Sequence, residues 1–392
     1  MKKESKILIS SLFECENKAC FCEKDIENVA PGEPPKATLK VCADESRPLQ
    51  FSYAPGEGLN LTGPAGGLVE SNLLGKLLAI PDDDIDALIS YFEKYGFLFP
   101  IGSNSYEAAN ADDIIAVIRR IKSTIRLMNS IGKRNYRNVL VNAAYLLYAP
   151  SVEFYFSDYY YSTCKHRYTE LIETYNLFPD LDRNQEVFDK GTYSVYDSFL
   201  KKENPVNIDF YNAVRSGSDT STPGSTLPHF KNLMAVYTGC TNEDADTRFL
   251  IDFFYDFQTQ FSIFKEVKYQ KIVPCSAIDE SQFTNEIKDA LIKIARIVVA
   301  SEINHNIKNI YPRYDGGELS ASWQVDTLID ALYFSLFYMK AGVEIYKECE
   351  NPNCKRDKYF LVEATRTNKK YCCRQCANAA AAQRHRNRNL NK

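Results

Sequence analysis

The spacing of hydrophobic and polar positions divides the chain into a short strand-rich start and a long helical part. Up to about residue 65, runs with strand-like composition alternate with Pro- and Gly-rich breakers, and we expect strands at 6–13, 37–43 and 49–53. From about residue 70 to 347, apolar residues recur at helical spacing. The pattern therefore predicts an α+β fold that is mainly helical.

Individual helices follow from the same spacing. The three aspartates after Pro81 predict a helix start, where carboxylates offset the helix dipole, although they could also bind a cation. Apolar stripes predict a helix over 111–130 and a last helix over 325–347, which would end next to Cys349 and join the body to the C-terminus without a linker. Further helices are expected near 136–148, 165–176, 246–266 and 283–309.

These elements suggest three parts. We expect a β-rich N-terminal segment over 1–68, a helical domain over 69–347 and a C-terminal module over 348–392. A loop rich in Ser, Thr and Gly, over 215–228, is expected to subdivide the helical domain.

Composition narrows the class of protein. With 45% hydrophobic and 25% charged residues, the 392-residue chain has the make-up of a soluble globular protein. Twelve cysteines are too few for a disulfide scaffold, and the start of the chain does not have the pattern of a secretory signal. We therefore expect reduced thiols and a cytoplasmic protein. The longest apolar run, 331–339, is too short to span a bilayer, so we expect no membrane partner.

The net charge of −4 hides an asymmetry between the body and the C-terminus. Residues 355–392 contain eleven Lys or Arg and two acidic residues, so this segment carries +9 and residues 1–354 carry −13. A basic segment attached to an acidic body is typical of a nucleic-acid contact module, although such a segment could also be a solvated charge run.

Four cysteines in this region have the spacing of a structural zinc site. They follow the pattern Cys349-x4-Cys354-x17-Cys372-x3-Cys376, which is two short-spaced pairs separated by a longer segment. Each pair would close a turn, and the metal would join two segments that have too little apolar surface to fold alone. The second pair has an alternative, because Cys373 also lies at a workable spacing from Cys376. Between the pairs, residues 359–362 and 369–371 predict a hairpin with Phe360 and Tyr371 as its small core.

The segment after the cysteines predicts a basic helix. Four successive alanines, 379–382, favour a helix strongly, although the segment could also fray into an extended tail. Basic side chains near the helix start would contact phosphates, whereas arginines with Gln and Asn could read base edges in a major groove. The residues expected to contact nucleic acid are Lys369, Lys370, Arg374, Gln383, Arg384, Arg386, Asn387 and Arg388.

This C-terminal region, from about Trp323 onward, resembles the CGNR-type zinc finger of bacterial proteins described as stress-induced transcription regulators. The matching positions are 349–354, Phe360, Arg366, 371–372, 376–378 and 383–388. In relatives a serine commonly follows the third cysteine, which assigns Cys372 to the site and leaves Cys373 outside it. Two signature positions differ, since Ala377 stands in place of glycine and Ala379 in place of arginine. The resemblance implies one structural Zn²⁺ held by Cys349, Cys354, Cys372 and Cys376.

Our leading hypothesis is a bacterial, cytoplasmic regulator of transcription that binds double-stranded DNA through the finger. The helical domain would sense a signal or form oligomers. Two alternatives remain open. The chain could be an RNA-acting effector, such as a nuclease or toxin with activity in residues 70–300, or the finger could dock a protein.

Other groups of residues give weaker signals. Cys15, Cys20, Cys22 and Cys42 could form a second zinc site or be ordinary strand cysteines. The stretch 119–137 holds seven basic residues and no acid, which predicts a solvated helix face, with a nucleic-acid surface or an anion pocket as alternatives.

No group of residues predicts an enzyme. Cys164 and His166 do not face each other on a helix, and the Glu302-x-x-His305 pair has no second copy, as a di-metal site would need. We therefore expect no catalytic residues.

Overall fold

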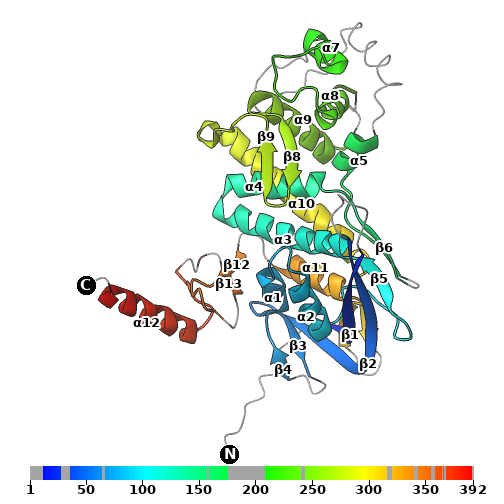
Figure 1. The fold of residues 1–392 in the computed structure, drawn as a ribbon, viewed down its shortest axis with the longest axis vertical. Coiled ribbons are helices and arrows are strands. Elements are labelled where there is room, and N and C mark those ends of the chain that lie inside the picture. Colours follow the sequence, from blue (N-terminus) through cyan, green and yellow to red (C-terminus); the bar gives the residue numbers. More distant parts are fainter. Residues whose placement is uncertain are drawn as a thin grey trace, which may run out of the picture. The chain divides into compact units, whose positions relative to one another are not determined.

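The computed structural model describes residues 12–27, 36–63, 67–156, 159–174, 208–239, 243–315, 320–339, 343–354, 358–363, 365 and 368–390. Contacts divide the chain into two compact units: unit 1 comprises Met1–Lys133, Val152–Thr163 and Glu302–Lys392, and unit 2 comprises Arg134–Ser151 and Cys164–Ser301. The fold is mixed α+β and mainly helical, as the sequence predicts (Figure 1). The boundaries expected at residues 68 and 347 both lie inside unit 1.

Unit 1 contains an antiparallel sheet in the order β1-β2-β3-β4, with β5 also paired to β2. Its strands are β1 (Phe13–Glu27), β2 (Lys36–Ala54), β3 (Gly58–Thr62), β4 (Leu68–Glu70) and β5 (Glu107–Asn110). At the start of β1, Phe13 and Cys15 are buried while Glu14 and Glu16 are exposed, so this strand has one core face and one polar face. The strands expected at 37–43 and 49–53 are both parts of β2, and most of the strand expected at 6–13 lies outside the described residues.

The pairing of β1 with β2 is interrupted once. Lys18 pairs with Pro48 and Ala19 pairs with Asp44, so residues 45–47 have no partner in β1. An irregularity of this kind bends the strands locally.

The helices of unit 1 are α1 (Leu73–Ala79), α2 (Ile85–Tyr95), α3 (Ala111–Lys133), α11 (Leu328–Tyr338), α12 (Arg374–Leu390) and the end of α10 (Asn285–Ile307). Asp84 is the N-cap of α2, and its side chain accepts a hydrogen bond from the N–H of Ala87 at 2.9 Å. The prediction that the aspartates begin a helix is thus confirmed. Three hairpins complete the unit: β6 (Glu153–Phe156) with β7 (Tyr159–Ser162), β10 (Tyr311–Asp315) with β11 (Ser320–Gln324), and β12 (Glu344–Glu348) with β13 (Tyr359–Glu363).

The last predicted helix is wrong in its extent. The helix α11 ends at Tyr338, and residues Glu344–Glu348 form the strand β12 instead. In β12 the apolar residues are Ile345 and Tyr346, both buried and between polar neighbours, which is compatible with a short strand. The body therefore continues into Cys349 through a strand and not through a helix.

Most of the basic side chains in α3 form ion pairs, and two of them are buried. Arg120 is 2% exposed and pairs with Glu302, which is fully buried at the end of α10. Lys122 is 1% exposed, and its Nζ donates to a carboxylate oxygen of Asp82 at 2.9 Å and to the carbonyl of Ile80 at 2.6 Å. The expectation of a solvated basic face over 119–137 is wrong for these two residues, because carboxylates from distant segments neutralise them.

The described residues of unit 2 form helices and one hairpin. Its elements are α4 (Tyr136–Tyr148), α5 (Arg167–Thr174), α7 (Ile208–Ser216), α8 (Pro228–Gly239), α9 (Ala245–Gln260), β8 (Phe264–Lys268), β9 (Lys271–Pro274), η1 (Glu280–Gln282) and most of α10. Aromatic rings fill its interior, where Phe254, Phe257 and Phe264 are fully buried and pack together. The helix expected over 246–266 ends at Gln260, since Phe264 begins a strand. No helix in the described part of the chain has the length and apolar character needed to cross a membrane.

The buried pair Arg120–Glu302 provides a test of the packing in unit 1. Glu302→Gln should lower the free energy of unfolding by about 3–5 kcal/mol, because Arg120 would stay buried without its counter-charge. Denaturation can be followed by the fluorescence of Trp323, which is the single tryptophan and lies in unit 1. Asp25→Asn is the control: its ion pair with Lys40 is half-exposed on both sides and screened by water, so this change should have little effect. Equal losses in both variants would contradict the role given to the buried pair.

Candidate metal centre and basic helix

The hairpin β12–β13 provides the platform of the C-terminal module. Its two strands pair in antiparallel register with Ile345 opposite Val362 and Lys347 opposite Phe360. Ile345, Phe360 and Val362 are buried in one small cluster with Cys349 and Cys376, and Tyr371 packs against it. The sequence predicted that residues 359–362 pair with 369–371, and this pairing is wrong, because 359–363 pair with 344–348 instead. The predicted contribution of Phe360 and Tyr371 to the small core is confirmed.

A turn after β12 positions the first two cysteines. The N–H of Cys349 donates to the carbonyl of Lys358 at 2.7 Å, and the N–H of Cys354 donates to the carbonyl of Asn351 at 3.0 Å. The side chain of Asn351 is buried and accepts from the N–H of Asn353 at 3.2 Å. Asn followed by Pro is a strong turn former, so the local sequence explains why the chain reverses here and brings both thiols to the same side.

The start of α12 positions the other two cysteines. The N–H of Ala377 donates to the carbonyl of Cys373 at 3.1 Å, so the helix begins around Cys373 and Arg374. Cys372 stands just before the helix and Cys376 lies in its first turn. Cys376 is buried in the cluster beneath the hairpin, which fixes the beginning of the helix against β12 and β13.

Four sulfur atoms meet at one point. The Sγ atoms of Cys354, Cys372 and Cys376 lie 3.5–3.6 Å from one another, and the Sγ of Cys349 belongs to the same group, within 4.8 Å of each. A tetrahedral metal with metal–sulfur bonds of about 2.3 Å requires sulfur atoms about 3.8 Å apart. A disulfide would require about 2.05 Å, and these cysteines are free. The four residues could therefore hold a metal ion.

Cys373 lies beside this group and outside it. Its Sγ is 3.8 Å from that of Cys372, but it does not belong to the set of four. The backbone N–H of Cys376 lowers the pKa of the Cys373 thiol below its ordinary value, as expected for a side chain at a helix N-terminus. The spacing of the cysteines allows either Cys372 or Cys373 as the third sulfur ligand, and the positions of the sulfur atoms favour Cys372.

Two asparagines attach the hairpin to the rest of unit 1. Asn129 of α3 exchanges two hydrogen bonds with the backbone of Tyr346: its Nδ2 donates to the carbonyl at 3.0 Å, and its Oδ1 accepts from the N–H at 3.0 Å. Asn72, the N-cap of α1, donates from Nδ2 to the carbonyl of Tyr359 at 2.7 Å. A side chain at Gly75 would collide with that carbonyl, so this close approach requires glycine.

Sequence reasoning missed these attachment residues. Asn72 precedes an apolar helical run and carries the ordinary signal of an N-cap, but nothing in the sequence indicates that it also reaches Tyr359. Asn129 lies inside a long helix and gives no signal at all.

The predicted nucleic-acid residues mostly lie on the surface. Arg374, Arg384 and Arg386 are exposed on α12 and make no ion pair with any residue in the described part of the chain. Lys370 is exposed and lies 3.4 Å from a carboxylate oxygen of Glu350, and Lys369 is exposed with its Nζ over the ring of Phe360. Gln383 is half-buried. Asn387 and Arg388 belong to α12, but their side chains lie outside the described residues.

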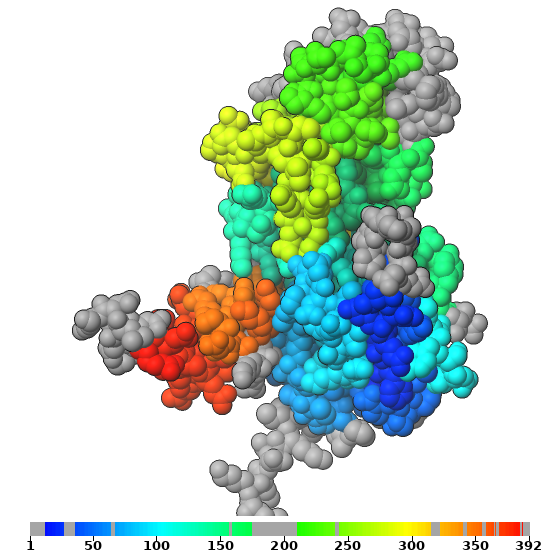
Figure 2. Space-filling model, in the orientation of Figure 1, coloured from blue at the N-terminus to red at the C-terminus, as the bar shows by residue number. Residues whose placement is uncertain are grey.

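Helix α12 and the hairpin lie next to each other at the C-terminal end of the chain. Figure 2 shows the helix in red beside the hairpin in orange, with its surface open on this face. Cys376 and Ala380, one turn apart, are buried, whereas the residues at 378, 379, 381 and 382 are exposed. The helix therefore rests on the hairpin along one edge of its first turns.

Most of the weaker candidates have structural explanations. The expectation that Cys164 and His166 do not face each other is wrong, because both residues precede α5 and the Sγ of Cys164 lies 4.0 Å from Nε2 of His166. Cys20 and Cys22 are buried strand residues, and burial raises the pKa of each thiol to about 12, which keeps both protonated. They do not gather with Cys15 or Cys42 into a metal-binding group among the described residues. The ring Nε2 of His305 lies 2.7 Å from the carbonyl of Ser162, so this side chain is occupied within unit 1.

Comparisons of the chain with protein-family models, with curated proteins and with solved structures found no match. The functional argument therefore depends on the geometry of the centre and on the surface of α12.

The assignment of the four sulfur ligands can be tested by metal content. Cys349→Ser should lose most of the bound metal, because oxygen from serine is a poor replacement for a thiolate and one of the four sulfur ligands would be gone. Cys373→Ser is the matched control and should keep one metal per chain. Elemental analysis of the purified proteins gives both values. If Cys373→Ser lost as much metal as Cys349→Ser, the proposed ligand set would be incorrect.

The attachment of the hairpin can be tested by hydrogen exchange. Asn129→Ala would leave the N–H and the carbonyl of Tyr346 without their partner, at a cost of about 1–3 kcal/mol for each buried group. The amide of Tyr346 should then exchange at least roughly tenfold faster. Asn104→Ala, at an exposed position of unit 1, should leave this amide unchanged. Unchanged protection in Asn129→Ala would show that other contacts hold the hairpin.

Proposed function

We propose that the chain is a zinc-dependent DNA-binding protein that regulates transcription, with α12 as the element that contacts DNA. One observation supports this proposal above all: four sulfur atoms gather at the base of a helix whose exposed arginines have no partner among the described residues. The resemblance of the same segment to the CGNR-type zinc finger supports the same function. Reduced thiols fit a cytoplasmic protein.

Zinc is the metal that suits the centre best. Thiolates are soft ligands that select zinc over magnesium or calcium, and sulfur spacings of 3.5–3.6 Å are close to those of a tetrahedral site. Four protein ligands fill a tetrahedral ion, which leaves no open position for water or substrate. The proposed metal is therefore structural, and its role is to hold the start of α12 against the hairpin.

Helix α12 has the dimensions and charge to lie along DNA. From Arg374 to Arg386 it extends roughly 18 Å at the rise of an α-helix, which exceeds the width of a major groove of about 12 Å. The arginines would bind phosphates, and the glutamine among them could reach base edges. Lys370 can add a further phosphate contact, because its exposed ion pair with Glu350 is weak and easily exchanged.

Binding to labelled double-stranded DNA at several salt concentrations tests the proposal. The variant Arg384→Ala/Arg386→Ala/Arg388→Ala should lose most of the affinity. It should also reduce the slope of log K against log salt by about 2–3, because each arginine releases about one counterion from a phosphate. The control Lys265→Ala/Lys268→Ala/Lys271→Ala removes the same charge from the exposed hairpin β8–β9 and should bind as the parent does.

Three outcomes would contradict the proposal. Absence of DNA binding at low salt would argue for a protein-docking module, and tighter binding to single-stranded RNA would favour an RNA-acting effector. Equal affinity in Cys349→Ser/Cys376→Ser and the parent would show that the metal centre does not position α12.

A further inference from the structure

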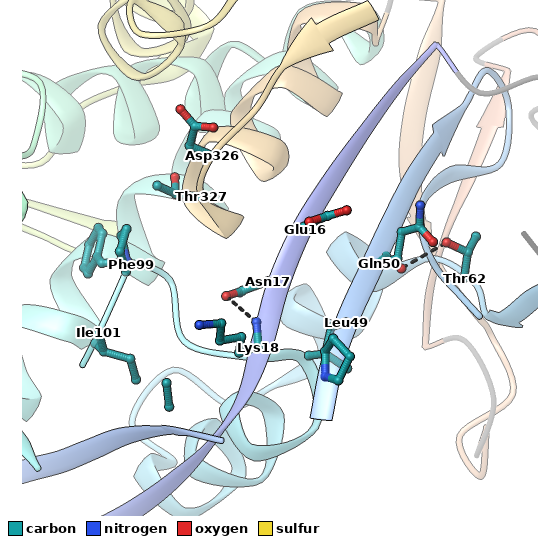
Figure 3. Close-up of a pocket in the computed structure, with 13 residues that line it drawn as sticks. Glu16, Asn17, Lys18, Leu49, Gln50, Thr62, Phe99, Ile101, Asp326 and Thr327 are labelled. Atoms are coloured by element: carbon teal, nitrogen blue, oxygen red, sulfur yellow. Dashed lines mark hydrogen bonds between the residues drawn. The ribbon is translucent and has the colours of Figure 1, made fainter. Parts of the chain in front are cut away.

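Two features of unit 1 lie outside the proposed function, and the first is a cavity of about 410 Å³ between β1, β2 and the 99–101 segment (Figure 3). Its carboxylates, Glu16 and Asp326, come from different elements and point apart in Figure 3. Thr62, which also lines it, donates to a backbone carbonyl at 3.0 Å, and the ring of Phe99 is buried among other aromatic rings. The described side chains around the cavity therefore do not converge on a ligand.

The second feature is a pair of thiols at the start of α12, Cys373 and Cys376. The N–H of Ala377 donates to the carbonyl of Cys373 at 3.1 Å, so one helical turn contains both cysteines. Cys376 belongs to the four-sulfur centre, whereas Cys373 does not. The Sγ of Cys372 lies 3.8 Å from that of Cys373 and 3.5 Å from that of Cys376. A thiol outside the ligand set thus stands beside the ligand thiols.

The helical turn gives Cys373 and Cys376 the backbone geometry of a disulfide. Two Cα atoms three residues apart in an α-helix are separated by about 5 Å, within the range of about 4.4–6.8 Å that disulfides span. Cys372 is a poorer partner for Cys373, because adjacent Cα atoms are only about 3.8 Å apart and a bridge between them would be strained. A Cys-x-x-Cys pair at a helix N-terminus is also the arrangement of redox-active dithiols.

Exposure decides which of the two thiols meets an oxidant first. Cys373 is partly exposed, whereas Cys376 is buried in the cluster beneath the hairpin. The proposed metal would also occupy the sulfur of Cys376 and leave that of Cys373 unoccupied. An accessible thiol next to a second thiol that can resolve its oxidised form is the usual composition of a redox-sensing pair.

We propose that Cys373 and Cys376 form a dithiol switch that a hydroperoxide oxidises, and that the resulting disulfide removes Cys376 from the metal centre. The effect on the metal rests on the proposed function. Three sulfur ligands would remain, which is one fewer than a structural zinc site requires. Because Cys376 also holds the start of α12 against the hairpin, oxidation would release the helix from its position and weaken DNA binding. Cellular thiols can reduce such a disulfide again.

The reaction balances with hydrogen peroxide as the oxidant. The sulfur of Cys373 attacks one peroxide oxygen, an S–O bond forms and the O–O bond breaks, and the released hydroxide takes up a proton to give water. The sulfur of Cys376 then attacks that of Cys373. An S–S bond forms, the S–O bond breaks, and the departing hydroxide takes up a proton to give a second water. Two electrons pass from the two sulfur atoms to the two peroxide oxygens.

Oxidation of the metal-loaded full chain by hydrogen peroxide tests the switch. Released metal is measured with a chromogenic chelator, and disulfides are mapped by mass spectrometry. Trypsin cleaves after Arg374, so a disulfide of Cys376 would join the peptides 371–374 and 375–384, and fragmentation between Cys372 and Cys373 identifies the partner. The parent should release its metal and form the Cys373–Cys376 disulfide. Cys373→Ser should release metal roughly tenfold more slowly, because the thiol outside the ligand set is gone.

Cys275→Ser is the matched control, since it removes a partly exposed thiol of unit 2 and should respond as the parent does. Reduction with dithiothreitol in the presence of zinc should restore the metal content of the oxidised parent. The proposal is overturned if Cys373→Ser releases metal as fast as the parent, if the disulfide joins another pair, or if none forms. Metal content before oxidation is a separate readout: a chain without metal that still forms the Cys373–Cys376 disulfide would support the dithiol and contradict the proposed function.

Discussion

The convergence of four thiols at one point is the constraint on which the C-terminal module depends. The buried cluster of the module consists of Ile345, Phe360 and Val362 with two of the cysteines themselves. Apolar burial on this scale offsets little of the conformational entropy that the hairpin, the turn and α12 lose when they become ordered. A metal bound by the four sulfur atoms would supply the missing free energy, since binding to such a site is coupled to folding.

This constraint extends into the body of unit 1 because β12 leads directly into Cys349. The side-chain amide of Asn129 makes the same two hydrogen bonds with the backbone of Tyr346 that a residue of a neighbouring strand would make. Its Nδ2 donates to the carbonyl of Tyr346, and its Oδ1 accepts from the N–H. Asn72 links β13 to the sheet in a second way: its Nδ2 reaches the carbonyl of Tyr359, and its N–H donates to the side chain of Asn60 in β3 at 3.0 Å. The same strand ends at Thr62, which lines the cavity. The sheet therefore borders both the hairpin and the cavity.

Features that depend on residues close together in the chain could be predicted from the sequence. Features that depend on contacts between distant segments could not. The helices at 111–130 and 136–148 follow from apolar periodicity, and the four-cysteine set follows from spacing, because each depends on neighbours in the chain. The end of α11 and the strand β12 could not be found in this way, since an apolar run is compatible with either element until its partner is known. The partner of β12 is β13, and the contacts of Asn129 and Asn72 join segments more than 200 residues apart.

The two basic segments show why charge alone does not identify a binding surface. In α3, Arg119, Arg120 and Lys122 meet Asp83, Glu302 and Asp82, which come from elsewhere in unit 1. Helix α12 contains no acidic residue, and its exposed arginines meet none among the described residues. Of the carboxylates that pair with α3, only Glu302 is fully buried, and Arg120 gains little from an external anion because its buried pair would first have to be broken at a high cost. The uncompensated positive charge of α12 remains available to a polyanion, and this difference, which depends on tertiary contacts, makes α12 and not α3 the candidate nucleic-acid surface.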